Sequence, residues 1–307
     1  MILCAGEALI DMLPRHTAEG EAAFAPHAGG AVFNTAIALG RLGVPTGFFT
    51  GLSTDLFGQV LERALTASGV DARLAARSAR PTTLAFVTLA DGHASYAFYD
   101  ENTAGRMLGP ADLPALPDTV EALFLGGISL AVEPCGATYE ALMLREAGAR
   151  VTMLDPNVRP GFVADEATYR ARLARLIAAA DIVKLSDEDL HWLLGPGDTA
   201  ALARDVLDRG PALVVLTRGA QGARAITRTA EAAVPARPAT VVDTVGAGDT
   251  FNAGLLAALR AGGHLSRAGL GCLSHAALVG ALDLAARAAA ITVSRAGANP
   301  PWKEELA

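Results

Sequence analysis

The stretch Val241-Val-Asp-Thr-Val-Gly-Ala-Gly-Asp-Thr-Phe-Asn-Ala-Gly-Leu-Leu-Ala-Ala-Leu259 decides how the rest of the chain is interpreted. Its first residues are β-branched and predict a strand. Gly246 and Gly248 break this strand with a turn of small residues. From Phe251 onward, leucines recur at helical spacing. The pattern therefore predicts a strand, a glycine turn and a helix.

The glycine turn is a candidate anion-binding site. The first turn of a helix leaves backbone N–H groups without partners, and the helix dipole makes this end positive. Glycines let a phosphate approach such a backbone closely. Asp249 follows directly, and a carboxylate there would repel a phosphate unless it accepts the proton of a hydroxyl that attacks a phosphoryl group. The motif alone leaves open the alternative that Asp249 only caps the helix.

Composition limits the possible classes of protein. The chain has 307 residues, of which 51% are hydrophobic, so it can form the core of one large α/β domain or of two small ones. It has no run of 18 apolar residues and no basic leader, so we expect neither a membrane span nor a signal peptide. Three distant cysteines match no disulfide framework or zinc site, which favours a cytoplasmic location. A net charge of −7 without a basic run disfavours nucleic-acid binding.

Several enzyme classes lack their motifs here. No Gly-Lys pair occurs, which excludes a P-loop, and no His-Arg-Asp or Asp-Phe-Gly occurs, which excludes a protein kinase. A dinucleotide oxidoreductase needs Gly-x-Gly-x-x-Gly after a strand, but Phe251 stands at the third glycine position. A non-catalytic sugar-binding protein stays open, although it would have no use for Asp249 beside an anion-binding turn.

The middle of the chain alternates between strands and helices. Repeated βα units imply a parallel sheet covered on both faces, with ligands at the carboxyl ends of the strands. Polar motifs follow three of these strands: Asp155-Pro-Asn-Val-Arg159, Lys184-Leu-Ser-Asp-Glu-Asp189 and Thr217-Arg-Gly-Ala-Gln-Gly222. Lys184 could form a surface salt bridge, but its place directly after Ile182-Val183 favours a head that faces a ligand.

The N-terminal third adds further polar positions and a hairpin. Residues 2–12 predict a first strand that carries Asp11, and a loop through Pro26 leads to Gly29-Gly30 and a helix with Asn34 in its first turn. Segments 83–89 and 94–99 are β-rich and are separated by Asp91-Gly92, a strong hairpin signal. Because this hairpin interrupts the α/β alternation, we expect it to leave the main sheet.

Two of these motifs resemble the signatures of one family. Segment 243–251 is similar to the C-terminal signature of the ribokinase-like (PfkB) carbohydrate kinases, and Gly29-Gly30-x-x-x-Asn34 with segment 39–43 is similar to their N-terminal signature. The resemblance covers essentially the whole chain. It implies a ribokinase-like three-layer α/β/α sandwich with a mostly parallel central sheet and a small β lid. It also implies a single domain over residues 1–307, with the lid formed by about 12–27 and 80–104.

The resemblance also assigns roles to individual residues. The implied catalytic residues are the base Asp249 and an anion hole of Gly246, Ala247 and Gly248. The implied sugar-binding residues are Asp11, Gly29, Gly30, Asn34, Phe98 and Arg159, although Phe98 could instead only pack the hairpin. The implied nucleotide-binding residues are Lys184, Thr217, Gly219 and Gly222.

The implied ligands are ATP, Mg²⁺ and a monovalent cation such as K⁺. The cation would lie near Asp243. Asp189 stands where the family usually has a glutamate tied to magnesium through water, so the charge is kept but the reach is one methylene shorter. The implied partners are a small-molecule sugar and ATP, together with a second copy of the chain joined through the lid.

Within the family, the chain is most similar to bacterial fructokinases, through segments 98–108 and 294–301. This predicts D-fructose as the phosphoryl acceptor. The main alternative is 2-keto-3-deoxygluconate, whose carboxylate Arg106 and Arg159 could clamp; other PfkB sugar or nucleoside kinases stay open. Asp11, Asp100 and Glu101 would repel an anionic substrate from the same pocket, which favours a neutral sugar.

Overall fold

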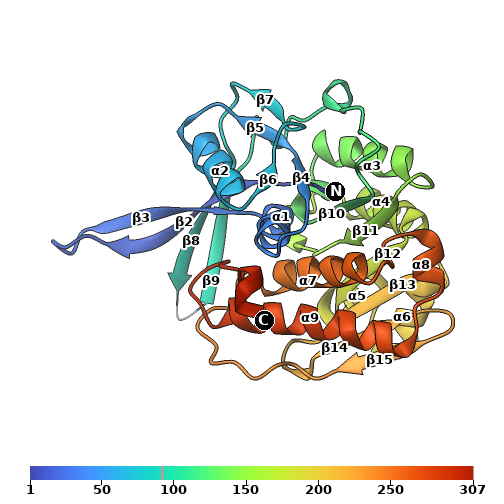
Figure 1. Cartoon of the computed structure of the whole chain (residues 1–307). Helices are drawn as coiled ribbons and strands as arrows, with labels where there is room; N and C mark the ends of the chain where they lie inside the picture. The colour runs from blue at the N-terminus through green and yellow to red at the C-terminus, as the bar shows by residue number, and fades with distance from the viewer. Residues whose placement is uncertain (91–92, 307) are drawn as a thin grey trace.

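The computed structural model describes residues 1–90 and 93–306, and its centre is a nine-stranded sheet (Figure 1). The strand order is β15-β14-β13-β12-β11-β10-β1-β4-β6, and neighbours are parallel from β6 to β13. At the other edge, β14 pairs antiparallel with both β13 and β15. The strands are β1 (Ile2–Ala5), β4 (Thr46–Phe49), β6 (Val70–Asp71), β10 (Ala122–Gly126), β11 (Val151–Asp155), β12 (Ile182–Ser186), β13 (Leu213–Thr217), β14 (Ala223–Ile226) and β15 (Glu231–Val234).

Helices cover both faces of this sheet and complete three layers. Side chains alternate between the faces, so Ile2 and Cys4 join one core while Leu3 and Ala5 join the other. The first face is covered by α1 (Ala31–Arg41), α2 (Leu56–Ala67), α7 (Ala247–Ala261), α8 (Arg267–Gly271) and α9 (His275–Val293). The second face is covered by α3 (Cys135–Glu146), α4 (Glu166–Ala179), α5 (Asp187–Leu194) and α6 (Thr199–Leu207). The predicted α/β/α sandwich with a mostly parallel sheet is confirmed.

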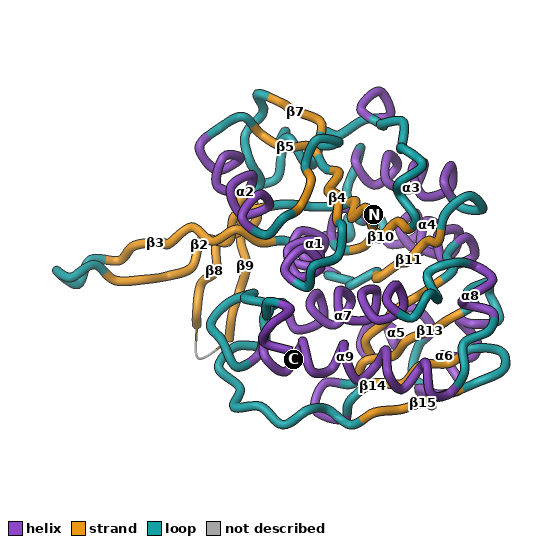
Figure 2. Tube along the Cα trace, viewed as in Figure 1, coloured by secondary structure: helices purple, strands orange, loops and turns teal. Residues whose placement is uncertain are grey.

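A second, four-stranded sheet projects from one side of this body (Figure 2). Its order is β3-β2-β8-β9, with β2 (Leu9–His16), β3 (Ala22–Gly29), β8 (Leu84–Ala90) and β9 (His93–Tyr99). These strands come from the two segments for which we expect a lid. β8 and β9 pair antiparallel, as the hairpin pattern predicts, while Asp91-Gly92 itself lies outside the described residues. A third sheet pairs β5 (Gly51–Ser53) with β7 (Ala76–Ser78).

Three local predictions were wrong. Residues 2–12 form two strands instead of one, because the chain leaves the central sheet after β1 and enters the small sheet at β2. The segment through Pro26 is not a loop but belongs to β3, which pairs with β2. Val241 and Val242 form no strand: they are 64% and 61% exposed, and the N–H of Val242 bonds to the carbonyl of Val293 at the end of α9.

One helix in the described part of the chain, α9, has the length and hydropathy that a membrane span requires. It packs against α7, with Gly254 fitting so closely that a Cβ there would lie 2.6 Å from the Cα of Ala285. A core helix of a folded domain passes the same test of length and hydropathy. The helix is therefore weak evidence for a membrane span.

Candidate active site

A cleft of about 1580 Å³ opens where the carboxyl ends of the strands, the start of α7 and the small sheet meet. Among the described residues that line it are ten predicted site residues: Asp11, Gly30, Asn34, Phe98, Arg159, Lys184, Asp243, Gly246, Gly248 and Asp249. Six predicted site residues are not in this lining: Gly29, Ala247, Asp189, Thr217, Gly219 and Gly222. The ten predicted residues in the lining therefore lie around one cavity, although they come from segments spread over most of the chain.

The start of α7 is open to this cleft. Gly246 caps the helix in the left-handed conformation, with φ of 77°, and a Cβ there would lie 2.7 Å from the Cβ of Ala298. A Cβ on Gly248 would meet only Lys184, whose Nζ would lie 3.3 Å away. This glycine therefore leaves room for a ligand to approach the backbone. Within the described residues, the N–H groups of Gly248 and Asp249 have no hydrogen-bond acceptor, whereas that of Ala247 bonds to the Thr244 carbonyl at 3.3 Å.

Asp249 lies in the first turn of α7 and is 8% exposed. The amide of Asn34, in α1, donates to its Oδ2 at 2.9 Å. Burial raises the pKa of Asp249 to about 7, with Asp155 and Glu7 acting in the same direction against the opposing effects of Asn34 and Lys184. A carboxylate with this pKa can exchange a proton near neutral pH, which suits a general base.

Glu7 holds the start of α1 and was not predicted as a site residue. The N-cap of α1 is Gly30, which has no side chain to accept from the first N–H groups. Glu7, between β1 and β2, supplies the acceptor instead: its Oε1 accepts from the N–H of Ala31 at 3.0 Å and of Val32 at 3.4 Å. Burial raises the pKa of Glu7 despite these hydrogen bonds. An acid embedded in the apolar run of the first strand was the available sequence signal.

Asp11 and Gly30 line one side of the cleft, and Gly29 lies against the carboxylate of Asp11. A Cβ on Gly29 would collide with the carboxylate of Asp11, so the glycine lets the acid lie flat against the backbone. Gly30 has φ of 109°, and a Cβ there would lie 2.9 Å from the carbonyl oxygen of Glu7. Burial raises the pKa of Asp11 to about 6.

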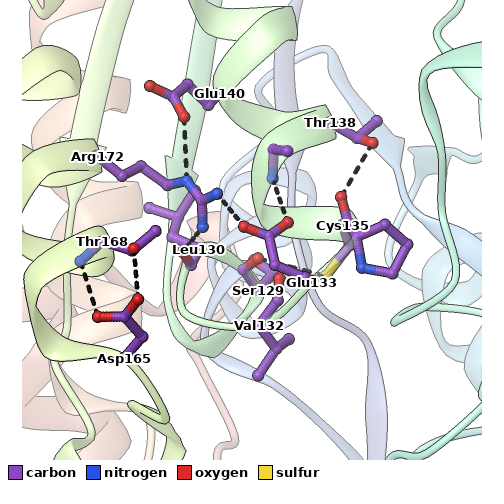
Figure 3. Close-up of polar contacts among 12 residues, drawn as sticks. Ser129, Leu130, Val132, Glu133, Cys135, Thr138, Glu140, Asp165, Thr168 and Arg172 are labelled. Atoms are coloured by element: carbon purple, nitrogen blue, oxygen red, sulfur yellow. Dashed lines mark hydrogen bonds and ion pairs between the residues drawn. The ribbon is translucent and has the colours of Figure 1, made fainter.

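Two arginines on the cleft wall are already engaged with protein groups. Nη1 of Arg106 donates to both carboxylate oxygens of Asp100, at 2.9 Å each. Arg172 of α4 donates from Nε to Glu140 of α3 at 3.1 Å and also contacts Glu133 (Figure 3). It donates as well to the backbone carbonyl of residue 130 at 2.8 Å. Neither guanidinium is free to clamp an anionic substrate without losing a protein partner.

Arg159 is exposed and donates only to backbone carbonyls nearby, at 3.1 Å and 3.5 Å. Arg159 is thus available to meet a ligand, as is Arg15 of β2, which is exposed in the cleft lining and donates to the carbonyl of Pro14. Phe98 packs edge to face on Phe162, with ring centroids 4.2 Å apart, so the small sheet touches the body beside Arg159. Glu101, which we expected near the pocket, is exposed and does not line it.

Lys184 is buried beneath the start of α7, where its Nζ lies 3.0 Å from Oδ2 of Asp155. The alternative of a surface salt bridge is therefore wrong, because both partners are buried. The predicted Thr217–Gly222 motif forms the turn from β13 to β14, next to the end of β12. In this turn Gly219 has φ of 48° and faces open space, and Gly222 has φ of 89°.

The two predicted metal-associated acids are occupied by backbone and hydroxyl groups. Asp189 accepts from the N–H of Val158 at 2.7 Å and, through its other oxygen, from the N–H and hydroxyl of Ser186. Asp243 accepts from the N–H groups of Val245 and Gly297 at 3.0 Å and 2.9 Å. In the described part of the chain, no group of three or more His, Cys, Asp or Glu residues is arranged to hold a metal.

Comparisons with known proteins identify the family of the chain. Residues 1–305 match the model of the pfkB family carbohydrate kinases. A fructokinase of Rhizobium leguminosarum bv. trifolii is 57% identical over 278 residues, which is 91% of this chain and 85% of that protein. The crystal structure of a fructokinase with bound ATP from Xylella fastidiosa superposes with a TM-score of 0.91, at 31% identity, over 99% of this chain and 96% of that one.

A third match is a double mutant of the Vibrio cholerae O395 fructokinase, in a form with fructose, ADP and potassium ion bound. Its TM-score is 0.84 at 26% identity, over 97% of this chain and 93% of that one. The chain belongs to the pfkB family of carbohydrate kinases. It is a sugar kinase, and the relatives that it matches with high coverage include fructokinases from several bacteria and plants.

Proposed function

We propose that this sugar kinase transfers the γ-phosphoryl group of ATP to D-fructose. The observation that carries the proposal is the pairing of Asp249 with an open helix start, in a chain 57% identical to a fructokinase. We infer that the attacking group is the terminal primary hydroxyl of the sugar that lies nearest to Asp249. The proposed sugar contacts are Asp11, Gly29, Gly30, Asn34, Phe98 and Arg159.

Asp249 acts as the general base in this proposal. Asn34 donates to Oδ2, and no donor among the described residues reaches Oδ1, which leaves this oxygen to accept the hydroxyl proton. A pKa of about 7 makes the carboxylate a stronger proton acceptor than an exposed aspartate while much of it stays ionised. The hydroxyl oxygen then attacks the phosphorus, and ADP leaves.

The start of α7 receives the negative charge of the transferring phosphoryl group. The N–H groups of Gly248 and Asp249 point from a positive helix end, and Lys184 adds an ammonium below them. Ala247 contributes less than predicted, because Thr244 already accepts from its N–H. Thr217, Gly219 and Gly222 would hold the nucleotide at the adjacent turn.

Mg²⁺ fits this site as an ion carried by the nucleotide. It keeps several waters and binds phosphates with one or two carboxylates, so a triad of protein ligands is not needed. When bound, it would neutralise charge on the phosphates, and Asp189 would reach it only through water. Because Asp243 joins the turn before α7 to Gly297, a monovalent cation such as K⁺ near it would order that turn.

The charges around the cleft favour fructose over 2-keto-3-deoxygluconate. Acidic side chains outnumber cationic ones in its described lining by seven to five. Arg106 and Arg172 are neutralised by Asp100 and by the acids of α3 and its preceding loop, so only Arg15 and Arg159, which donate to nearby backbone carbonyls, would be left to hold a carboxylate. A neutral sugar avoids this requirement.

We further infer that the small sheet is the lid of a single domain and joins two copies of a cytoplasmic homodimer. Phe24 and Tyr99 both pack edge to face on Phe86 and remain 42% and 62% exposed. An aromatic surface of this kind suits burial against a second copy. Sedimentation at several protein concentrations would test this assignment, and a monomer throughout would contradict it.

A coupled assay of ADP release with a panel of sugars tests the substrate. We expect D-fructose to have a higher kcat/KM than 2-keto-3-deoxygluconate, and a direct competition between them should consume fructose first. Preferential use of the keto acid would overturn the substrate but keep the sugar kinase. Sugar binding without any ADP release would support a non-catalytic sugar-binding protein instead.

A further inference from the structure

Asp155 is a motif residue to which the proposed mechanism gives no role. It ends β11, is 2% exposed and does not line the cleft. Its Oδ2 accepts two hydrogen bonds, from Nζ of Lys184 at 3.0 Å and from Nδ2 of Asn252 at 2.7 Å. One oxygen atom therefore connects β11 to the neighbouring strand β12 and to the helix α7.

We propose that Asp155 is a positioning residue for phosphoryl transfer, which holds Lys184 as an ammonium ion under the start of α7 while Asn252 fixes Asp155 to that helix. The proposal rests on the proposed role of Lys184 beside the transferring phosphoryl group of ATP. It adds two residues, Asp155 and Asn252, that touch neither sugar nor nucleotide in the proposed mechanism.

The geometry places this group directly below the proposed phosphate site. Leu154 pairs with Val183 in the sheet, so Asp155 and Lys184 occupy adjacent places at the carboxyl ends of their strands. The Nζ of Lys184 would lie 3.3 Å from a Cβ on Gly248. Asn252 follows the base Asp249 by three residues and therefore lies on the same side of α7. A shift of Asp155 would move the ammonium relative to the base.

A purely stabilising role explains the cluster less well. Desolvation of two buried charges offsets most of their attraction, so a buried ion pair contributes little net stability. In addition, Oδ1 of Asp155 and Oδ1 of Asn252 accept no hydrogen bond from the described residues. Buried acceptors without partners are costly. The arrangement is better explained by the need to keep a cation at this point.

The charges that face Lys184 come from three elements: Asp155 from β11, Asp189 from α5 and Asp249 from α7. Burial lowers the pKa of Lys184, but these carboxylates, led by Asp155, outweigh it and keep the pKa above its ordinary value. Without Asp155, the pKa of Lys184 falls. The ammonium then loses its proton at a lower pH than in the wild type, and ATP binding falls with it.

The experiment is a titration of MgATP binding without sugar, repeated across pH. It uses the wild type, Asp155→Asn, Lys184→Met and the double variant. We expect Asp155→Asn to weaken ATP binding by about 10- to 100-fold, the scale of a lost charge-assisted hydrogen bond. We expect the loss to deepen at alkaline pH, and the double variant to bind no more weakly than Lys184→Met alone.

Two further variants separate positioning from general damage. Asn252→Ala leaves the ion pair intact and should weaken ATP binding in the same direction by a smaller factor. If Asp155→Asn does not fold, Asn252→Ala becomes the test of the proposal. Wild-type MgATP affinity in Asn252→Ala would then show that Asn252 does not hold Asp155 in place. Asp181→Asn removes a carboxylate that bonds to Thr152 and Arg267 just before β12, and it should leave ATP binding unchanged.

Three results would overturn the proposal. Wild-type ATP affinity with an unchanged pH profile in Asp155→Asn would overturn the positioning role and leave the nucleotide site standing. A double variant whose loss of ATP affinity equals the product of the two single losses would do the same. A wild-type protein that binds no ATP would overturn the proposed nucleotide site together with it. The failure of the positioning role is thus distinguishable from the failure of the sugar kinase mechanism.

Discussion

The start of α7 and the small sheet both border the cleft but are built in opposite ways. At α7 the side chains of Asn34, Lys184 and Asp249 each make a hydrogen bond to another side chain and are less than a tenth exposed. In the small sheet, Phe24 and Tyr99 leave much of their rings in solvent, and the β2–β3 hairpin extends away from the body (Figure 1). The comparison teaches that the charged groups are fixed before substrate arrives, whereas the small sheet, which we propose to cover the sugar, has room to adjust.

Replacing the base tests the fixed region most severely. Asp249→Asn keeps the shape of the side chain but cannot take a proton, so turnover should fall by at least ~10²-fold while ATP binding stays near normal. In the wild type, kcat/KM should rise with pH through about 7 as Asp249 loses its proton. A pH–rate profile and an ATP titration check both results. Wild-type turnover in the purified variant would contradict the assignment.

Gly248→Val tests whether a phosphate group approaches the backbone at the start of α7. The residue is not in the left-handed region, so the expected damage comes from the side chain, which would meet Lys184 and fill the space of a phosphate. We expect a loss of about 10²-fold in kcat, the scale of a lost oxyanion-hole donor. Gly280→Ala in α9, where a Cβ meets nothing within 4 Å, is the matched control. Unchanged ATP affinity and rate in a folded Gly248→Val variant would contradict the role of the glycine turn as an anion-binding site.

Removing the acid that caps α1 tests how the fixed region is held. Glu7→Ala leaves the N–H groups of Ala31 and Val32 unpaired, so the free energy of unfolding should fall by about 1–2 kcal/mol. Turnover should fall as well, because α1 carries Asn34 to the base. Asp198→Ala removes the cap of α6, away from the cleft, and should lower stability without lowering turnover. Equal turnover in both variants would show that Glu7 serves the fold alone.

The smallest effects are expected in the small sheet. Hydrogen exchange of residues 84–90 and 93–99 should slow when fructose is added, because a lid that closes protects its strands. Exchange in β13 and β14, on the far side of the central sheet, is the internal control. Equal protection with and without a productive sugar would argue that the small sheet is only structural.

The sequence predicted the layered fold because its evidence is local and repeated. Strand and helix patterns alternate, glycines mark the turns, and the segment from Gly246 to Leu259 has the helical spacing observed in α7. The same local evidence failed for Val241 and Val242. Their β-branched side chains favour a strand, but no strand in the described part of the chain pairs with them, and pairing depends on distant parts of the chain.

The site was predictable in part for the same reason. Short motifs identified Asp249, Asn34 and Lys184 as polar residues at element ends, and the structure brings all three to one cleft. Motifs carry no information about which side chains meet in space. The capping of α1 by Glu7 and the contact of Asp155 with Asn252 therefore appeared only in three dimensions.

The hydrogen bond between Asn34 and Asp249 joins residues 215 positions apart. Contacts of such long sequence separation close late, because much of the chain must be ordered before they form. We therefore expect catalytic competence to appear in the last phase of refolding, after the secondary structure has formed. A chain still emerging from the ribosome would contain the proposed sugar contacts, from Asp11 to Arg159, before α7 is synthesised. Such a nascent chain could not hydrolyse or transfer the phosphoryl group of ATP, because Asp249 and Asn34 would not yet be in contact.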